Sequence, residues 1–142
     1  MKEMTYQEII DKMGGFIYYP VGTSMLPLIR ESLDSVKLIA IHRPIKKYDV
    51  VLYKRDNDKY ILHRVVKTHH NCFDMIGDNQ LAIEKNITRE QIIAILDGIY
   101  QQDKFVSIHS FHYKLYVRSR FWVRLWRKFL NRMRRCFRKQ KS

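Results

Sequence analysis

The sequence predicts a mainly β fold with one short helix at its N-terminus and one basic amphipathic helix at its C-terminus. Short runs rich in β-branched and aromatic residues recur from Phe16 onward. Apolar residues at helical spacing occur near the two ends of the chain. With 142 residues, 46% of them hydrophobic, the chain can bury one core of ordinary size. We therefore expect one domain over residues 1–110, followed by a helical tail over residues 111–142.

The N-terminal helix is predicted by its capping residues. Thr5 followed by Glu8 forms a capping-box pattern, in which each side chain bonds to a free backbone N–H of the other residue. The apolar residues that follow recur at helical spacing up to Met13. Gly14-Gly15 then ends the helix.

The strands are predicted from short apolar runs bounded by polar turn residues. Arg55–Asp58 has the composition of a hairpin turn, and Thr68–Asn71 suits the next connection, so three neighbouring strands can form a meander. In the middle strand, alternation places Ile61, His63 and Val65 on one face. The expected strands are Phe16–Val21, Val36–Ile41, Val50–Tyr53, Tyr60–Lys67, Cys72–Ile76, Ile92–Leu96 and Phe105–Ile108.

The positive charge of the chain belongs to its tail. All 14 Asp and Glu lie at or before Asp103, together with 14 of the 27 Lys and Arg, so residues 1–103 are formally neutral. The other 13 basic residues lie between Lys104 and Lys141. A basic amphipathic helix with two Trp suits the interface of an anionic membrane. The residues expected to make this contact are Trp122, Trp126, Arg127, Arg134 and Arg135. The alternative is that the apolar stripe packs on the body or on another protein.

The cysteine content, the polar N-terminus and the lack of a long apolar stretch favour a cytoplasmic location. Cys72 and Cys136 are far apart in the sequence, so we expect reduced thiols. The N-terminus is polar, and no apolar stretch approaches the roughly 18 residues of a spanning helix. We expect a cytoplasmic protein that lies peripherally on the inner face of the cell membrane.

Ser24 is the candidate nucleophile. It follows an expected strand within Gly-Thr-Ser-Met-Leu-Pro at residues 22–27, where a turn can present its hydroxyl. A serine hydroxyl needs a base within hydrogen-bond reach, and His63 suits that role because imidazole titrates near neutrality. Asp78, after the expected strand Cys72–Ile76, is the candidate that orients the imidazole.

Four segments in this order resemble the S24/S26 serine peptidases, the signal peptidases and their relatives. They are residues 22–27, Asp49-Val50-Val51 with the two residues after it, residues 61–66 with His63-Arg64-Val65, and Ile76-Gly77-Asp78-Asn79. The resemblance spans residues 16–98 and implies a compact signal-peptidase or LexA-like β body. Because the base position holds His63, it points to the serine–histidine branch of the endoplasmic-reticulum and archaeal type.

The resemblance implies a serine endopeptidase that cleaves a peptide, a precursor or a leader segment. Ser24 would be the nucleophile, His63 the general base and Asp78 the third member. The backbone N–H of Ser24 would be one oxyanion donor.

Three positions depart from the family pattern. Tyr48 stands where the family has Gly before Asp49, and Gly22 stands where many members have a hydroxyl residue that helps the oxyanion hole. Residues 80–85 replace the family's longer box after Gly-Asp-Asn. The alternative function is a catalytically degenerate module that binds peptides, for example in a peptide-maturation pathway.

Other classes of function have weaker support. The side chains of His69, His70 and Cys72 lack the spacing of a recognised zinc site, so we expect neither a metal nor a cofactor. Nucleic acid is disfavoured because no helix-turn-helix precedes the body. Arg64 is expected on the strand face opposite His63, in solvent or in a salt bridge.

Overall fold

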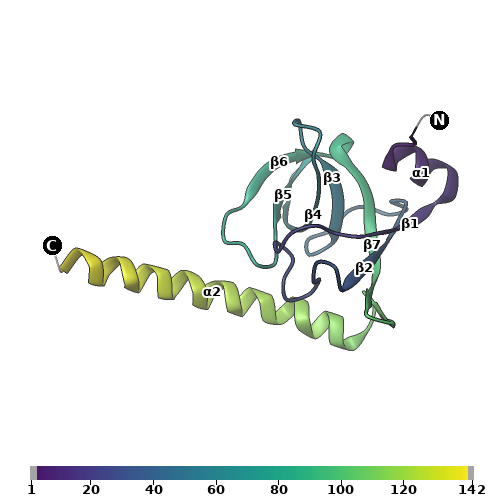
Figure 1. Ribbon diagram of the computed structural model, residues 1–142. Coiled ribbons are helices and arrows are strands. Elements are labelled where there is room, and N and C mark those ends of the chain that lie inside the picture. Colours follow the sequence, from purple (N-terminus) through teal and green to yellow (C-terminus); the bar gives the residue numbers. More distant parts are fainter. Residues whose placement is uncertain (1–2, 141–142) are drawn as a thin grey trace. The chain divides into compact units, whose positions relative to one another are not determined.

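A computed structural model describes residues 3–140 (Figure 1). The chain divides into two units, one ending at Ile108 and one beginning at His109. The first unit is a mainly antiparallel β body with a short N-terminal helix, and the second contains a single long helix. The predicted fold class, mainly β with a helix at each end, is confirmed.

Helix α1 (Tyr6–Met13) begins and ends at the residues that the sequence indicated. The Thr5 side chain accepts a hydrogen bond from the Glu8 backbone N–H, and the Glu8 carboxylate accepts one from the Thr5 N–H at 2.7 Å. Gly14 ends the helix in the left-handed conformation at φ 74°.

All the strands described belong to one antiparallel sheet. Its order is β1-β2-β7-β3-β4-β5-β6, and β8 also pairs with β7. The strands are β1 (Gly15–Tyr18), β2 (Asp34–Ile39), β3 (Val50–Lys54), β4 (Tyr60–Thr68), β5 (Cys72–Ile76), β6 (Glu84–Thr88), β7 (Ile92–Gln101) and β8 (Lys104–Ser107).

The meander predicted from the turn residues is present as β3-β4-β5. Within the β3–β4 turn, the Asp58 N–H donates to the Arg55 carbonyl and the Arg55 N–H donates to the Lys59 carbonyl. The core lies against one face of the meander and against β7. Its buried cluster consists of Val51, Tyr53, Val65, Phe73, Met75, Ile87, Ile92 and Ile95.

Strand β6 was not expected from the sequence. It forms one end of the sheet order, and only Ile87 of its five residues is buried. Its remaining side chains are polar, so the alternation of apolar and polar residues that indicates a half-buried strand is missing. Strand β7 is also longer than expected, because it continues to Gln101 in order to pair with β2 and β8.

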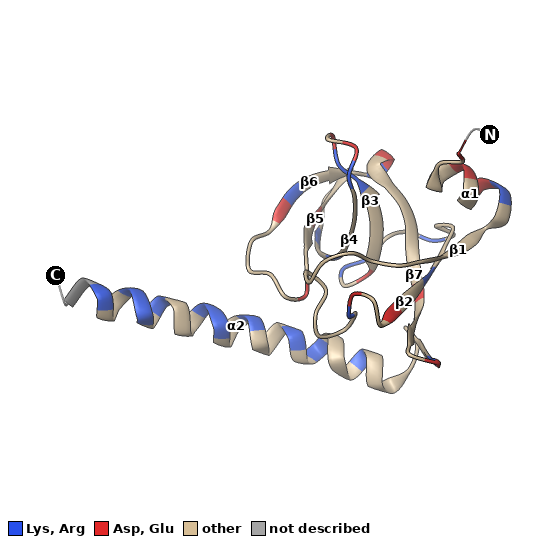
Figure 2. Ribbon diagram, viewed as in Figure 1, with Lys and Arg blue, Asp and Glu red and all other residues tan. Residues whose placement is uncertain are grey.

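Helix α2 (Phe111–Gln140) is the second unit. It contains 11 Lys and Arg residues and no acidic residue, so basic side chains recur along its whole length (Figure 2).

Candidate active site

Ser24 lies in a series of turns between β1 and β2, and this loop is tied to the turn that follows β5. The Asn79 N–H donates to the Ser24 carbonyl at 2.8 Å, and the Asn79 side-chain amide donates to the Thr23 carbonyl at 3.2 Å. Gly77 permits this approach, because a Cβ atom there would lie 2.6 Å from the Ser24 carbonyl oxygen. The turn after β5, more than fifty residues further along the chain, thus holds the Ser24 loop in place.

Within residues 3–140, no hydrogen bond engages the Ser24 backbone N–H. Gly22 has φ 93°, a left-handed value that favours glycine. Any residue with a side chain, a hydroxyl residue included, would therefore be strained at position 22.

A small cavity of about 40 Å³ lies between the Ser24 loop and the start of β4. Strand β4 pairs with β3 from Tyr60 onward, whereas its pairing with β5 begins only at Arg64. The first residues of β4 are therefore bordered on their other side by the loop and the cavity. The residues that line the cavity are Tyr18, Pro20, Val21, Gly22, Ser24, Met25, Ile29, Tyr60, Ile61 and Leu62.

His63 follows these cavity residues directly along β4. It lies opposite Val51 of β3, on the face that carries the core cluster, and only 3% of its surface is exposed. Burial lowers the pKa of His63 to about 4, even though the nearby Glu84 raises it. The imidazole is therefore neutral at pH 7, the state in which a ring nitrogen can accept a proton.

The hydrogen-bond partner of His63 is Tyr53 of β3. His63 Nδ1 lies 3.2 Å from the Tyr53 hydroxyl oxygen, which in turn donates to Glu84 Oε2 at 2.7 Å. Arg55 binds the same carboxylate, through Nε to Oε1 at 2.9 Å and through Nη2 to Oε2 at 2.6 Å. None of Tyr53, Arg55 and Glu84 was predicted as a site residue.

Asp78 binds Arg64. Arg64 Nε and Nη2 donate to the two carboxylate oxygens of Asp78, each at 2.8 Å, and Arg64 Nη1 donates to the Tyr48 carbonyl at 2.9 Å. Arg64 and Asp78 are both fully buried, at 1% and 0% exposure. Arg64 is therefore salt-bridged rather than solvated. The charge of Asp78 raises the pKa of His63, by less than the charge of Glu84 does.

The structure links Ser24 to the turn of Asp78 and Asn79 through the Asn79 N–H, and the charge of Asp78 acts on His63. Among the described residues, no hydrogen bond links the Ser24 hydroxyl to His63. Such bonds are often long in unliganded enzymes and tighten only when substrate is bound. No group of three metal-ligating side chains occurs in the part of the chain that the structure covers.

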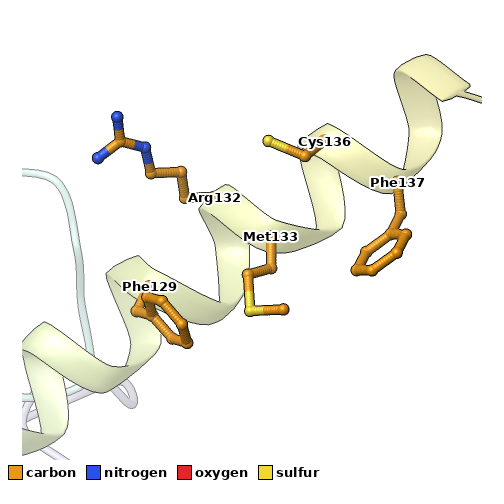
Figure 3. Close-up of a pocket in the computed structure, with 5 residues that line it drawn as sticks. All are labelled: Phe129, Arg132, Met133, Cys136 and Phe137. Atoms are coloured by element: carbon orange, nitrogen blue, oxygen red, sulfur yellow. The ribbon is translucent and has the colours of Figure 1, made fainter.

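Helix α2 carries the second set of predicted contact residues. Trp122 and Trp126 are exposed by 70% and 62%, and Phe129 and Phe137 are also exposed. Near its C-terminal end, Phe129, Met133 and Phe137 project from one side of the helix, while Arg132 points away from them (Figure 3). Neither α1 nor α2, within residues 3–140, has the length and apolar content needed to cross a bilayer.

Comparisons with known proteins identify no relative of this chain. No protein-family profile matches it, and neither curated proteins nor solved structures give a significant match.

Proposed function

We propose that this chain is a serine endopeptidase that cleaves a peptide or a leader segment, with Ser24 as nucleophile and His63 as general base. The observation that carries the proposal is the fixed position of the Ser24 loop. Hydrogen bonds from Asn79 hold the loop, and it borders a cavity whose opposite wall is the start of β4, the strand that carries His63.

In each half of the reaction, His63 first takes a proton and then returns it. His63 takes the proton from the Ser24 hydroxyl as Oγ bonds to the substrate carbonyl carbon and the carbonyl π electrons move to oxygen. The Ser24 N–H is one donor to that oxyanion. When the C–N bond breaks, the protonated imidazole returns its proton to the leaving amine. Water then hydrolyses the acyl-enzyme by the same route.

A peptide substrate fits the form of the site. Because the first residues of β4 pair on one side with β3, their other side offers backbone groups next to the Ser24 loop. An extended peptide can bind such an edge by main-chain hydrogen bonds, with side chains entering neighbouring pockets. The scissile bond would then lie beside Ser24.

The backbone at Tyr48 gives independent support to the resemblance. Tyr48 has φ 77°, in the left-handed region that favours glycine. This is the position at which the family pattern has Gly. A tyrosine that keeps a glycine conformation supports a fold that matches the family at this turn.

A fluorophosphonate probe tests the proposal, because it forms a covalent bond only with an activated serine. We expect the full-length protein to be labelled, Ser24→Ala to lose all labelling, and His63→Gln to lose roughly 100- to 10,000-fold in labelling rate. Ser35→Ala, which removes a partly buried hydroxyl from β2, is the matched control and should label normally. Equal labelling of wild type and Ser24→Ala would contradict the proposal.

Two observations favour the second candidate, a peptide-binding module without hydrolysis. Ser24 and His63 share no hydrogen bond in the described structure, and burial lowers the pKa of His63 far below that of an ordinary imidazole. Such a module would bind peptides with an affinity that Ser24→Ala leaves unchanged. A wild-type protein that binds a peptide but neither cleaves it nor reacts with the probe would establish this candidate.

We further propose that α2 holds the protein to an anionic membrane surface, with the body facing cytoplasmic substrates. The helix carries 11 basic residues, no acidic residue, and exposed Trp122 and Trp126. Indole rings favour the boundary between headgroups and acyl chains, and each basic residue near an anionic surface adds about 1 kcal/mol.

A further inference from the structure

A chain of hydrogen bonds leads from His63 on β4, through Tyr53 and Glu84, to Arg55 directly after β3. His63 Nδ1 contacts the Tyr53 hydroxyl, which donates to Glu84, and Arg55 binds the Glu84 carboxylate through two nitrogens. Tyr53 is completely buried and His63 nearly so. Water therefore does not compete for the bond between His63 and Tyr53, whereas the Arg55 and Glu84 side chains remain partly exposed, by 35% and 27%.

Proton accounting fixes the direction of each bond. Burial raises the pKa of Glu84, but hydrogen bonds from Arg55 and Tyr53 outweigh it and hold this pKa below its usual value, so the carboxylate only accepts. The single proton of the Tyr53 hydroxyl points to Glu84. The Tyr53 oxygen can then only accept from His63, which requires a hydrogen on Nδ1.

A neutral imidazole carries one ring hydrogen, so a hydrogen on Nδ1 leaves Nε2 with a free lone pair. We infer that Tyr53 and Glu84, supported by Arg55, are positioning residues that hold His63 in the Nδ1–H tautomer, so that Nε2 is the atom that accepts the serine proton. The role of Nε2 rests on the proposed function, whereas the tautomer does not. The three residues orient the base, the role that the resemblance assigns to Asp78.

The same chain stabilises His63 after it has accepted a proton. The Glu84 charge favours the imidazolium, because it raises the pKa of His63. Arg55 reduces this effect, because its charge lowers the same pKa.

Glu84→Gln gives the most specific test, because it should reverse the donor and acceptor roles in the hydrogen bonds between residue 84, Tyr53 and His63. The amide oxygen of Gln can accept from Arg55, while its NH₂ group donates to the Tyr53 oxygen. The Tyr53 proton would then point to His63 Nδ1, and His63 would take the Nε2–H tautomer. Tyr53→Phe removes the acceptor altogether, so Nδ1–H would no longer be the held form.

The test is ¹⁵N NMR of the full-length protein, with His63 identified by the signals that His63→Gln removes. We expect a protonated Nδ1 and a bare Nε2 in the wild type, Nε2–H in Glu84→Gln, and loss of the pure Nδ1–H form in Tyr53→Phe. Tyr100→Phe, which removes a hydroxyl from β7, should behave as wild type. An Nε2–H wild type, or a Tyr53→Phe variant that remains purely Nδ1–H, overturns the inference.

Labelling by the fluorophosphonate separates this inference from the proposed function. Both Tyr53→Phe and Glu84→Gln should label more slowly than wild type, by at least about tenfold, because Nε2 is no longer reliably free to act as the base. A wild type in the Nδ1–H form that does not label would disprove the peptidase while leaving the tautomer assignment intact. Normal labelling of a variant whose tautomer has changed would disprove the positioning role.

Discussion

At the scale of single residues, the turn before β3 depends on a backbone conformation that its side chain does not favour. Tyr48 holds φ 77°, while its N–H donates to the Val65 carbonyl at 2.7 Å and its carbonyl accepts from Arg64. An L-residue other than glycine pays about 1–2 kcal/mol for left-handed backbone. These hydrogen bonds hold Tyr48 in this conformation, and they thereby fix the direction in which the chain enters β3.

Tyr48→Gly should therefore be more stable than Tyr48→Ala, by about 1 kcal/mol in the free energy of unfolding, since alanine keeps the strain and glycine removes it. Urea denaturation of the two variants measures the difference. Tyr19, an exposed tyrosine without a positive φ, supplies the control pair, in which glycine should be the less stable variant. The same order at both sites would contradict the argument.

The buried pair of Arg64 and Asp78 makes the largest predicted difference at this scale. Asp78→Asn leaves the Arg64 charge buried without its counter-ion and should lower the free energy of unfolding by about 3–5 kcal/mol. Asp97→Asn breaks the more exposed pair with Lys37 and should cost less than about 1 kcal/mol. Equal losses in chemical denaturation would show that Asp78 has no special structural role.

At the scale of elements, β6 shows how an edge strand can carry a site residue without a sequence signal. Its one buried residue, Ile87, faces Phe73 of β5 in the sheet register. Glu84 lies on the same strand and accepts a hydrogen bond from Tyr53 of β3. The residues around Glu84 in the sequence do not predict this contact. Period-two alternation located the strand of His63, but it could not locate the partner of its Nδ1 atom.

Helix α2 should bind vesicles through charge and aromatic side chains together. We expect the full-length protein to sediment with vesicles that contain phosphatidylglycerol and only weakly with pure phosphatidylcholine, with binding that falls as salt rises. Replacing Arg127, Arg134 and Arg135 by Gln should weaken binding roughly 100-fold, at about 1 kcal/mol for each charge.

Trp122→Ala with Trp126→Ala should weaken binding to both kinds of vesicle, because the indoles enter the interface whatever the headgroup charge. Tyr19→Ala removes an exposed aromatic side chain of the body and serves as the control. Failure of the full-length protein to bind anionic vesicles would contradict membrane attachment through α2. The apolar stripe of α2 would then be assigned to a contact with protein.

At the scale of the whole molecule, stability should depend on pH through His63. The pKa of His63 is about 4 in the folded state and about 6.5 in the unfolded chain, so between these values only the unfolded state binds the proton. The His63 contribution is therefore complete above about pH 6.5, and it declines as pH falls towards 4 by a total of about 3 kcal/mol.

Urea denaturation between pH 7 and 4.5 measures this effect. His63→Gln should show a smaller loss of stability over that range than wild type, and His42→Gln, which removes an exposed imidazole, should follow wild type. Three carboxylates with lowered pKa values, Asp34, Asp74 and Glu84, act at lower pH, because each keeps its charge below the pH at which an ordinary carboxyl group titrates. Parallel curves for wild type and His63→Gln would contradict the assigned burial of His63.

Features that depend on neighbouring residues could be predicted from the amino-acid sequence. Capping residues placed α1, turn residues placed the meander, alternation put His63 on the core face, and the loss of acidic residues after Asp103 marked the basic helix. These signals are local, because a helix cap or a strand face is set within a few positions along the chain.

The tertiary structure alone decided which charged and polar groups meet. In the folded chain Asp78 forms an ion pair with Arg64, and His63 contacts the Tyr53 hydroxyl. Glu84 accepts from the same hydroxyl, although it comes from β6, a strand without apolar–polar alternation. The sequence cannot fix such pairs, because a buried carboxylate is stabilised by whichever donor the sheet register places within about 3 Å of it. That register follows from the packing of the whole β body, which no short segment encodes.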